Sequence, residues 1–385
     1  MPYDSIDKLQ KALQDSVFKE SAAPKKAAGR ALGTFVELIT LYLLRTWGLR
    51  DALAIERRVP EYAYEQIRHN VEFSLHPHTR VATITLPLSK LPITASKLHK
   101  AASNGGINFG KGTIAKSGSG TILETGLRSR NACVFYNETD HFYTGWISRI
   151  DKDAAHIDIL RLALSPLAVL ECKRVGVEEG QKRGPQTIEK AKQGAYVART
   201  VSSLQRFRRR DGSIAGLIEN AHGRIEIGDY YEMLRAICAT QTDALAQRVV
   251  LSVGIVSNHG NWFDKNHDPY KEMRVLSQSY DWLLFLSDAG LSKFISDACS
   301  DTALNKTVQK VFRASYSKAE TGKKSKNAMT KVTIDLAADA ELTAYFRAEQ
   351  YMIKSWFSVI SPDGSTLDEL ENELMVLSES GRNRA

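Results

Sequence analysis

Cysteine is scarce in this 385-residue chain, and its pattern excludes two kinds of site. The four cysteines are far apart, with no Cys-x-x-Cys pair and no Cys/His spacing typical of zinc: Cys133, Cys172, Cys238 and Cys299. Neither a zinc centre nor a disulfide framework is indicated. We therefore predict a reduced, intracellular protein.

Long apolar runs are also missing. The most apolar segment, FVELITLYLLRTWGL from Phe35, is short for a membrane span and carries two charges, Glu37 and Arg45. The N-terminal stretch MPYDSIDKLQKALQDS is polar and amphipathic, which predicts no secretory signal. No internal repeat and no Gly-x-Ser-x-Gly nucleophile motif is present. We expect a soluble, cytoplasmic protein with no membrane partner.

Positive charge, by contrast, is in excess and concentrated. The formal net charge is +8, within an ordinary globular composition of 43% hydrophobic and 25% charged residues. Between residues 173 and 210 there are eleven Lys or Arg and only three acidic residues. This tract favours a polyanionic partner such as nucleic acid.

The order of the predicted elements indicates an α/β protein. A strong helix is expected at 28–47 and short strands between 70 and 130. From 131 the strands ACVFYN, YTGWISRI, AHIDILRL and LAVLECKR precede a helix near 186–204 and a strand RVVLSVGIVS. The remainder reads as helical. We predict an N-terminal helical and β elaboration at 1–130, a mixed-sheet core at 131–265 and a mainly helical region at 266–385 for DNA recognition or dimerisation, with helix 28–47 a candidate part of the core.

The most informative stretch is LAVLECKR, an apolar strand that ends on Glu171-Cys172-Lys173. Side chains alternate along a strand, so Glu171 and Lys173 share one face and Cys172 points to the other. Asp158 lies inside the preceding apolar strand, AHIDILRL. A tight turn between the two strands predicts an antiparallel hairpin that brings Asp158 beside Glu171.

Asp158 followed by Glu171-x-Lys173 resembles the signature of the PD-(D/E)XK nuclease superfamily, from about Tyr136 to Leu204. The resemblance implies a restriction-endonuclease-like mixed sheet flanked by helices, with helical elaborations at both ends. It implies Mg²⁺, with Mn²⁺ as a substitute, held by Asp158 and Glu171, while Lys173 positions or activates the attacking water. It further implies a type II restriction enzyme that cuts double-stranded DNA as a homodimer, with a DNA methyltransferase as its genetic partner.

Further residues are assigned roles by the same resemblance or by their charge. Glu37 matches the acidic residue that many members carry on an early helix, and Gln193 matches a glutamine near the metal site in some members. Lys182, Arg183 and Lys190 surround the predicted start of the helix near 186 and are expected to contact the DNA backbone.

Other interpretations stay open. A repair, junction-resolving or mobile-element nuclease would share the same core, and a non-catalytic DNA-binding protein would use the basic tract alone. Gly105, Gly110 and Lys111 approximate a phosphate-binding loop, but Gly112 stands where Ser or Thr is required. Two short stretches are expected to be loops, with DNA contact an open alternative for each. One is SNHGNWFDKNHD, which resembles an HNH motif at His259, Asn261 and His267 but in which Asp268-Pro269 would end the helix that the motif needs, and the other is the lysine-rich segment 317–331.

Overall fold

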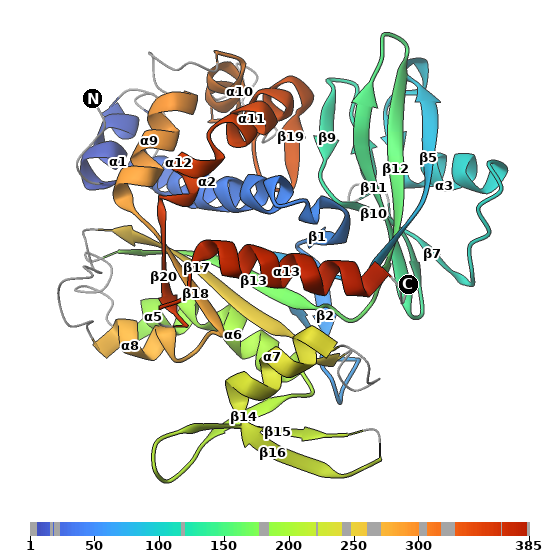
Figure 1. The fold of residues 1–385 in the computed structure, drawn as a ribbon. Coiled ribbons are helices and arrows are strands. Elements are labelled where there is room, and N and C mark those ends of the chain that lie inside the picture. Colours follow the sequence, from blue (N-terminus) through green and yellow to red (C-terminus); the bar gives the residue numbers. More distant parts are fainter. Residues whose placement is uncertain are drawn as a thin grey trace.

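A 23-residue helix, α2 (Pro24–Thr46), runs through the centre of the computed structural model (Figure 1). The structure describes residues 6–15, 18, 24–116, 120–176, 185–220, 222–240, 248–259, 271–299, 306–316, 328–362 and 364–382. Phe35, Leu38 and Ile39 of α2 are fully buried, as expected of the apolar middle of a core helix. Gly48 follows with φ of 79°, a left-handed conformation that glycine adopts without strain and that ends the helix.

A six-stranded mixed sheet lies against α2, in the order β1-β4-β13-β17-β18-β20. β13 pairs in parallel with β17 and antiparallel with β4, and β17 pairs in parallel with β18. The bounds are β1 (Leu53–Ile55), β4 (Phe73–Leu75), β13 (Ala168–Gly176), β17 (Leu251–His259), β18 (Trp282–Leu286) and β20 (Phe357–Ser361).

Helices cover both faces of this sheet. Ala168, Leu170 and Cys172 of β13 are buried in one apolar cluster with α2, whereas Val169 is buried in another with Val197 of α6. The period of two therefore directs Glu171 and Lys173 to the α6 side. On the first face lie α2 and α9 (Asp288–Cys299); on the second lie α5 (Pro185–Ala191), α6 (Gln193–Val201) and α8 (Lys271–Ser277).

A large β-rich insertion separates β4 from β13 along the chain. It forms a five-stranded antiparallel sheet in the order β5-β12-β11-β10-β7, on the right of Figure 1. Its elements are β5 (His78–Pro87), η2 (Leu88–Lys90), α3 (Ala95–Asn104), β7 (Gly112–Ile114), β10 (Cys133–Glu138), β11 (His141–Ile150) and β12 (Ala154–Ala163). A smaller four-stranded sheet combines β6 (Ile93–Thr94), β8 (Thr121–Leu123), β9 (Arg128–Arg130) and β19 (Thr333–Asp335).

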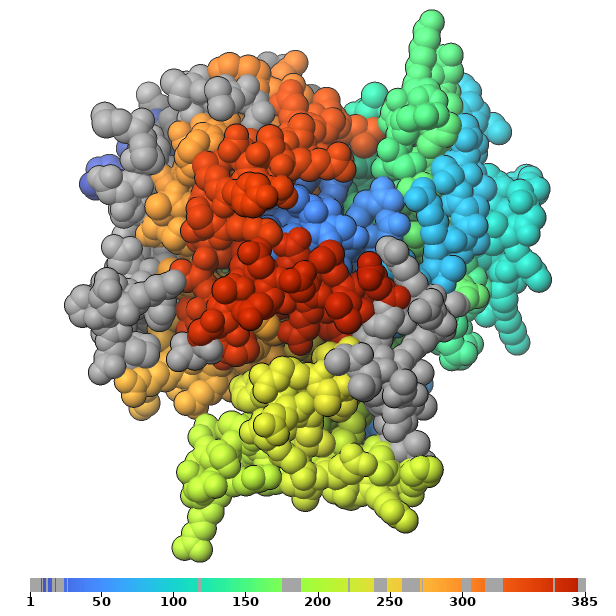
Figure 2. All heavy atoms as spheres, viewed as in Figure 1, coloured from blue at the N-terminus to red at the C-terminus, as the bar shows by residue number. Residues whose placement is uncertain are grey.

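The remaining elements surround the central sheet. A three-stranded sheet of β14 to β16 projects from the body in Figures 1 and 2. Helix α13, drawn in red, crosses the face seen in both figures. The bounds are α1 (Ile6–Asp15), η1 (Leu49–Ala52), β2 (Arg58–Pro60), β3 (Arg68–Asn70), β14 (Gln205–Arg208), β15 (Ile214–Glu219), β16 (Ile225–Asp229), α7 (Tyr230–Thr240), α10 (Lys306–Tyr316), α11 (Leu336–Ala348), α12 (Gln350–Lys354) and α13 (Leu367–Arg382).

Three expectations about the architecture need correction or refinement. The predicted hairpin is wrong, because Asp158 on β12 pairs with β5 and β11 while β13 belongs to the other sheet. The predicted helix near 186–204 is divided into α5 and α6. The central sheet also takes strands from each of the segments 1–130, 131–265 and 266–385, so it is not confined to the middle one.

The expectation that no segment suits a membrane also changes. In the described part of the chain one helix, the Ala27–Thr46 stretch of α2, is long and apolar enough to cross a bilayer. However, 67% of the 18-residue window that qualifies is buried inside the fold, which is consistent with the core helix of a soluble protein.

Candidate active site

Glu171 and Lys173 lie on β13 beyond Leu170, where the pairing with β4 ends. Glu171 is only 5% exposed, and its Oε1 lies 2.6 Å from the Lys173 ammonium. The two side chains share a face of the strand, as the sequence predicts. The apolar first part of β13 is thus followed by an ion pair in which Glu171 is buried and Lys173 is partly exposed, rather than by two solvated charges.

Glu72, just before β4, is the residue that the sequence interpretation missed. The backbone N–H of Cys172 donates to Glu72 Oε2 at 2.8 Å, and the backbone N–H of Glu72 donates to Glu171 Oε2 at 3.3 Å. The Lys173 ammonium lies 3.2 Å from Glu72 Oε1. Where β4 and β13 stop pairing, side-chain carboxylates therefore take up backbone N–H groups, which fixes Glu72, Glu171 and Lys173 together.

Lys331 joins this group from the other side. Its side chain is 5% exposed, and its ammonium lies 3.3 Å from Glu37, 3.7 Å from Glu56 and 3.9 Å from Glu72. It also lies 5.6 Å from the centre of the Phe73 ring. Glu37 of α2 thus enters the site through Lys331, which belongs to the described end of the lysine-rich segment 317–331.

The charges of this carboxylate cluster, Glu37, Glu56, Glu72, Glu171, Lys173 and Lys331, are unbalanced. Four carboxylates face two ammonium groups, so the ionised cluster has an excess of negative charge. Burial, together with the neighbouring Glu72 carboxylate, raises the pKa of Glu171. Burial also raises the pKa of Glu37, although Lys331 opposes this effect.

The two lysines respond in the opposite sense to the carboxylates around them. Burial acts to lower the pKa of Lys173, but Glu171 and Glu72 outweigh it and raise that pKa above its ordinary value. Burial likewise acts to lower the pKa of Lys331, but the charges of Glu72 and Glu37 outweigh it and raise that pKa. Both lysines are therefore ammonium ions at neutral pH.

Asp158 does not lie beside Glu171. Its carboxylate is 1% exposed and accepts hydrogen bonds from Arg50 at 2.8 Å, Arg80 at 2.5 Å and Thr83 at 2.9 Å. Burial acts to raise the pKa of Asp158, but the hydrogen bonds from Arg50 and Thr83 and the charges of Arg50 and Arg80 lower it. Asp158 is a buried ionic link between η1 and the inserted sheet, so the prediction that it lies beside Glu171 is wrong, and the acidic residue in contact there is Glu72.

The other predicted residues lie around α5 and α6. Lys182 and Arg183 are outside the described residues, and Lys190 is exposed on α5. Gln193 is exposed at the start of α6, next to Gly194, whose added Cβ would lie 2.4 Å from the Glu171 Cβ. Gln193 is thus the neighbour of Gly194, the α6 residue that lies against Glu171.

Part of the basic tract is structural. Arg206 donates to the Ser279 carbonyl and its guanidinium lies 3.7 Å from Asp281, with 9% of the side chain exposed. Arg208 donates to the Gly212 carbonyl at 2.9 Å. These arginines fasten β14 to its neighbours, so their charge is not simply free to hold a polyanion.

The structure describes the phosphate-loop-like stretch but only a small part of the HNH-like stretch. Gly105 follows helix α3, and the N–H of Gly110 donates to Glu138 Oε1 at 2.7 Å, so a carboxylate lies where a phosphate would bind. No strand-loop-helix arrangement surrounds them, since the helix comes first and strand β7 follows. In the HNH-like stretch, Asn261 and His267 lie outside the described residues, and of His259 only the backbone is described.

Comparison with known proteins gives no family for this chain. No family model matches it. No curated protein and no solved structure matches it significantly. The case for a function therefore depends on the carboxylate cluster itself.

The cluster fits magnesium by its donor chemistry. Mg²⁺ prefers a few carboxylate oxygens, and the excess negative charge favours a divalent cation. Within the described residues, however, no three His, Cys, Asp or Glu side chains are close enough to hold a metal. The reason is visible in the contacts, because Lys173 stands between Glu171 and Glu72, and Lys331 between Glu37 and Glu72.

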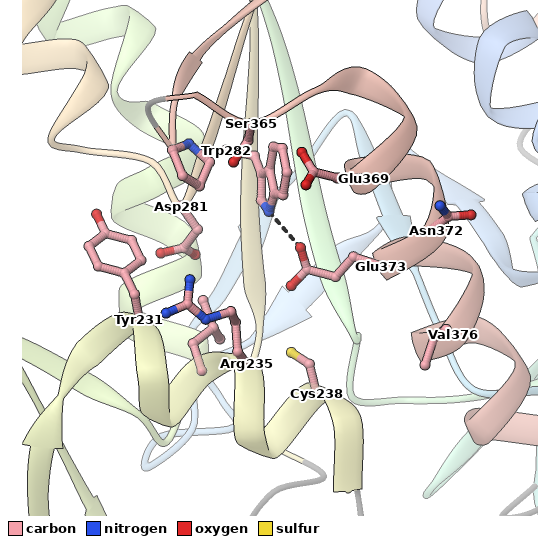
Figure 3. Close-up of a pocket in the computed structure, with 12 residues that line it drawn as sticks. Tyr231, Arg235, Cys238, Asp281, Trp282, Ser365, Glu369, Asn372, Glu373 and Val376 are labelled. Atoms are coloured by element: carbon pink, nitrogen blue, oxygen red, sulfur yellow. Dashed lines mark hydrogen bonds between the residues drawn. The ribbon is translucent and has the colours of Figure 1, made fainter.

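A separate cavity of about 390 Å³ lies between α7 and α13 (Figure 3). Asp281, Glu369 and Glu373 line it together with a single guanidinium, that of Arg235. Burial raises the pKa of Glu373, which accepts a 2.7 Å hydrogen bond from the indole N–H of Trp282. Its acidic lining does not suit a polyanion, so it is not part of a nucleic-acid site.

Proposed function

We propose that this chain is a Mg²⁺-dependent endonuclease that hydrolyses phosphodiester bonds of double-stranded DNA, with Glu72, Glu171 and Lys173 at its catalytic centre. The observation that supports the proposal most is the interlocked arrangement of these three residues where β4 and β13 stop pairing. An acidic residue, a second acidic residue and a lysine two positions later are the parts of a PD-(D/E)XK site.

The central sheet supports the same proposal. β1, β4 and β13 form an antiparallel set, β17 adds in parallel, and helices lie on both faces. We propose that this is a restriction-endonuclease-like core in which α2 supplies Glu37. Here the acidic residue of the motif is Glu72, before the large insertion, rather than Asp158.

Glu72 and Glu171 would hold the metal, with Glu37 close by. When bound, Mg²⁺ would lower the pKa of a water molecule and neutralise charge on the phosphodiester. Lys173 stays protonated between two carboxylates, so it acts as a cation that orients water or stabilises developing negative charge. Its raised pKa disfavours the alternative role of proton acceptor.

A plasmid-cleavage assay tests this proposal. Wild-type protein with Mg²⁺ is expected to cut supercoiled DNA, and EDTA is expected to abolish cutting. Glu171→Ala and Lys173→Ala should each lower the cleavage rate by about 100-fold or more, as removal of one catalytic group usually does. Glu189→Ala is the matched control, because Glu189 is 64% exposed on α5 and pairs with its neighbour Lys192.

The outcomes separate the alternatives. Equal cleavage by all variants would refute the assignment of the active site. Tight, salt-sensitive DNA binding without any cleavage would favour the non-catalytic DNA-binding protein. Discrete bands would favour a type II restriction enzyme, whereas a smear would favour a repair, junction-resolving or mobile-element nuclease.

The biological setting remains part of the proposal. A type II enzyme would act in the cytoplasm as a homodimer, and a DNA methyltransferase encoded nearby would protect the host sites. Sedimentation of the purified chain with and without duplex DNA tests the dimer.

A further inference from the structure

A basic cleft of about 520 Å³ adjoins the carboxylate cluster. Glu56 belongs to both, because it lines the cleft and lies 3.7 Å from Lys331. The backbone N–H of Glu56 also donates to the carbonyl of Glu72 at 3.0 Å, so a residue that lines the cleft is directly hydrogen-bonded to Glu72. Its cationic lining comprises Arg57, Arg58, Arg68, Lys116 and Arg130.

Arg57 is a partly buried cation without a carboxylate partner among the described residues. Its guanidinium lies 3.6 Å from the centre of the Phe142 ring and donates to Asn137 Oδ1 at 3.3 Å, while its buried Nε has no hydrogen-bond partner. Burial, and then the charge of Arg68, lowers the pKa of Arg57 to about 10. Two neighbouring guanidinium groups in a cleft, one of them partly buried and without a carboxylate partner among the described residues, favour a bound anion.

The two walls of the cleft come from different parts of the fold. Arg57, Arg58 and Arg68 lie on and beside the β2–β3 hairpin next to the central sheet, whereas Lys116 and Arg130 belong to the chain between β4 and β13. The insertion therefore closes the cleft from the opposite side. Two carboxylates, Glu56 and Glu138, accompany the five cations, so the lining is positive overall.

We infer that this cleft binds a backbone phosphate of the DNA strand next to the scissile one, with Arg57 as its anchor and the β-rich insertion as a clamp. The inference rests on the proposed function, because a scissile phosphate exists only if the chain cuts DNA. The binding itself depends only on the cleft. A guanidinium fork matches the geometry of a phosphate, and each neutralised phosphate releases counterions.

Binding of a fluorescent 30-base-pair duplex in EDTA tests the inference without cleavage. Arg57→Met replaces the guanidinium over Phe142 with an uncharged thioether and so removes the charge, and Arg58→Gln changes an exposed residue. Each should weaken binding about five- to tenfold and lower the slope of log affinity against log salt by about one. Lys100→Gln is the control, because Lys100 is an exposed cation on α3, does not line the cleft and should bind within about twofold of wild type.

The results separate failure of the cleft from failure of the enzyme. If both variants bind and cut DNA like Lys100→Gln, the cleft assignment is overturned while the nuclease proposal stands. If wild type binds through the cleft but cuts nothing, the nuclease proposal fails and the cleft stands. Should Arg57→Met lower the melting temperature markedly, Arg58→Gln decides the matter alone. Stabilisation by inorganic phosphate without any duplex binding would also overturn the inference, since the cleft would then serve a small anion.

Discussion

At the residue scale, the contacts of Lys173 decide its protonation state. Its ammonium lies 2.6 Å from Glu171 and 3.2 Å from Glu72, and these contacts keep it protonated. Glu72 in turn accepts from the Cys172 N–H, so its position is fixed by the backbone of the strand that carries the other two residues. Removing Glu72 would therefore remove a proposed catalytic group and also change the orientation of its neighbours.

A comparison of Glu72→Gln with Asp158→Asn tests which acidic residue serves the site. Glu72→Gln should lower the cleavage rate by about 100-fold with little change in the free energy of unfolding. Asp158→Asn should destabilise the fold by roughly 3 kcal/mol, because Arg50 and Arg80 lose their buried carboxylate, and leave the folded enzyme active. Urea unfolding and cleavage rates measure both. The assignment would be reversed if Asp158→Asn stayed as stable as wild type but inactive while Glu72→Gln cut normally.

The raised pKa of Glu171 predicts how stability depends on pH. Because the folded protein favours the protonated carboxyl, Glu171 contributes stability below its unfolded pKa, and that contribution is lost as pH rises through the raised folded pKa. Glu171→Gln mimics the protonated form. In EDTA, its melting temperature should exceed that of wild type at pH 7, and the difference should shrink at pH 4. A lower melting temperature for Glu171→Gln at pH 7 would contradict this account.

At the scale of elements, the close contact between α6 and β13 holds Glu171 in place. Gly194 is buried, and a Cβ there would lie 2.4 Å from the Cβ of Glu171 and 3.0 Å from the Tyr280 hydroxyl. The Tyr280 hydroxyl donates to the carbonyl of Ala191 at 2.7 Å, so it is not free to move aside. The helix can approach the strand this closely only because position 194 has no side chain.

Gly194→Ala should therefore disturb both stability and activity. We expect a loss of about 1–3 kcal/mol from overpacking and a cleavage rate reduced roughly tenfold as Glu171 shifts. Gly126→Ala is the control, since a Cβ at Gly126 meets nothing within 4 Å. Thermal unfolding and cleavage assays on the two variants give the comparison. Wild-type behaviour of Gly194→Ala would show that α6 does not position Glu171.

At the scale of the whole molecule, the core is assembled from distant parts of the chain. β4 and β13 are separated by the insertion that forms the five-stranded sheet, and β18 and β20 come from the last third of the chain. Glu37, Glu72, Glu171 and Lys331 reach one site from four separate segments. The insertion supplies one wall of the basic cleft as well, so the cleft joins the insertion to the segment around β2 and β3.

Residues 131–265 alone should consequently fail to fold. The isolated segment keeps β13 and β17 but loses β1, β4, β18 and β20, together with the apolar cover of α2. Circular dichroism should show no cooperative thermal transition for the segment, and a single main transition for the full chain. A cooperative transition of the isolated segment would mean that the middle of the chain is an independent domain.

The sequence by itself determined the local features of this protein. Alternation along LAVLECKR places Glu171 and Lys173 on one face and Cys172 in the core, and the apolar run after Pro24 forms a buried helix ended by Gly48. These features depend on periods of 2 and 3.6 residues and on the backbone freedom of glycine, all of which are readable within a few positions. The α/β class followed from the same patterns.

Only the tertiary structure decided which acidic residue meets Glu171. Asp158 and Glu72 both lie at apolar strands, but the first is 13 residues from Glu171 and the second is 99 residues away. The short HNVEFSL stretch carries the alternation that would have marked Glu72 as a candidate, yet nothing local shows which strands pair. Strand pairing depends on how whole apolar faces are buried, and burying β13 between α2 and α6 placed β4, not β12, beside it.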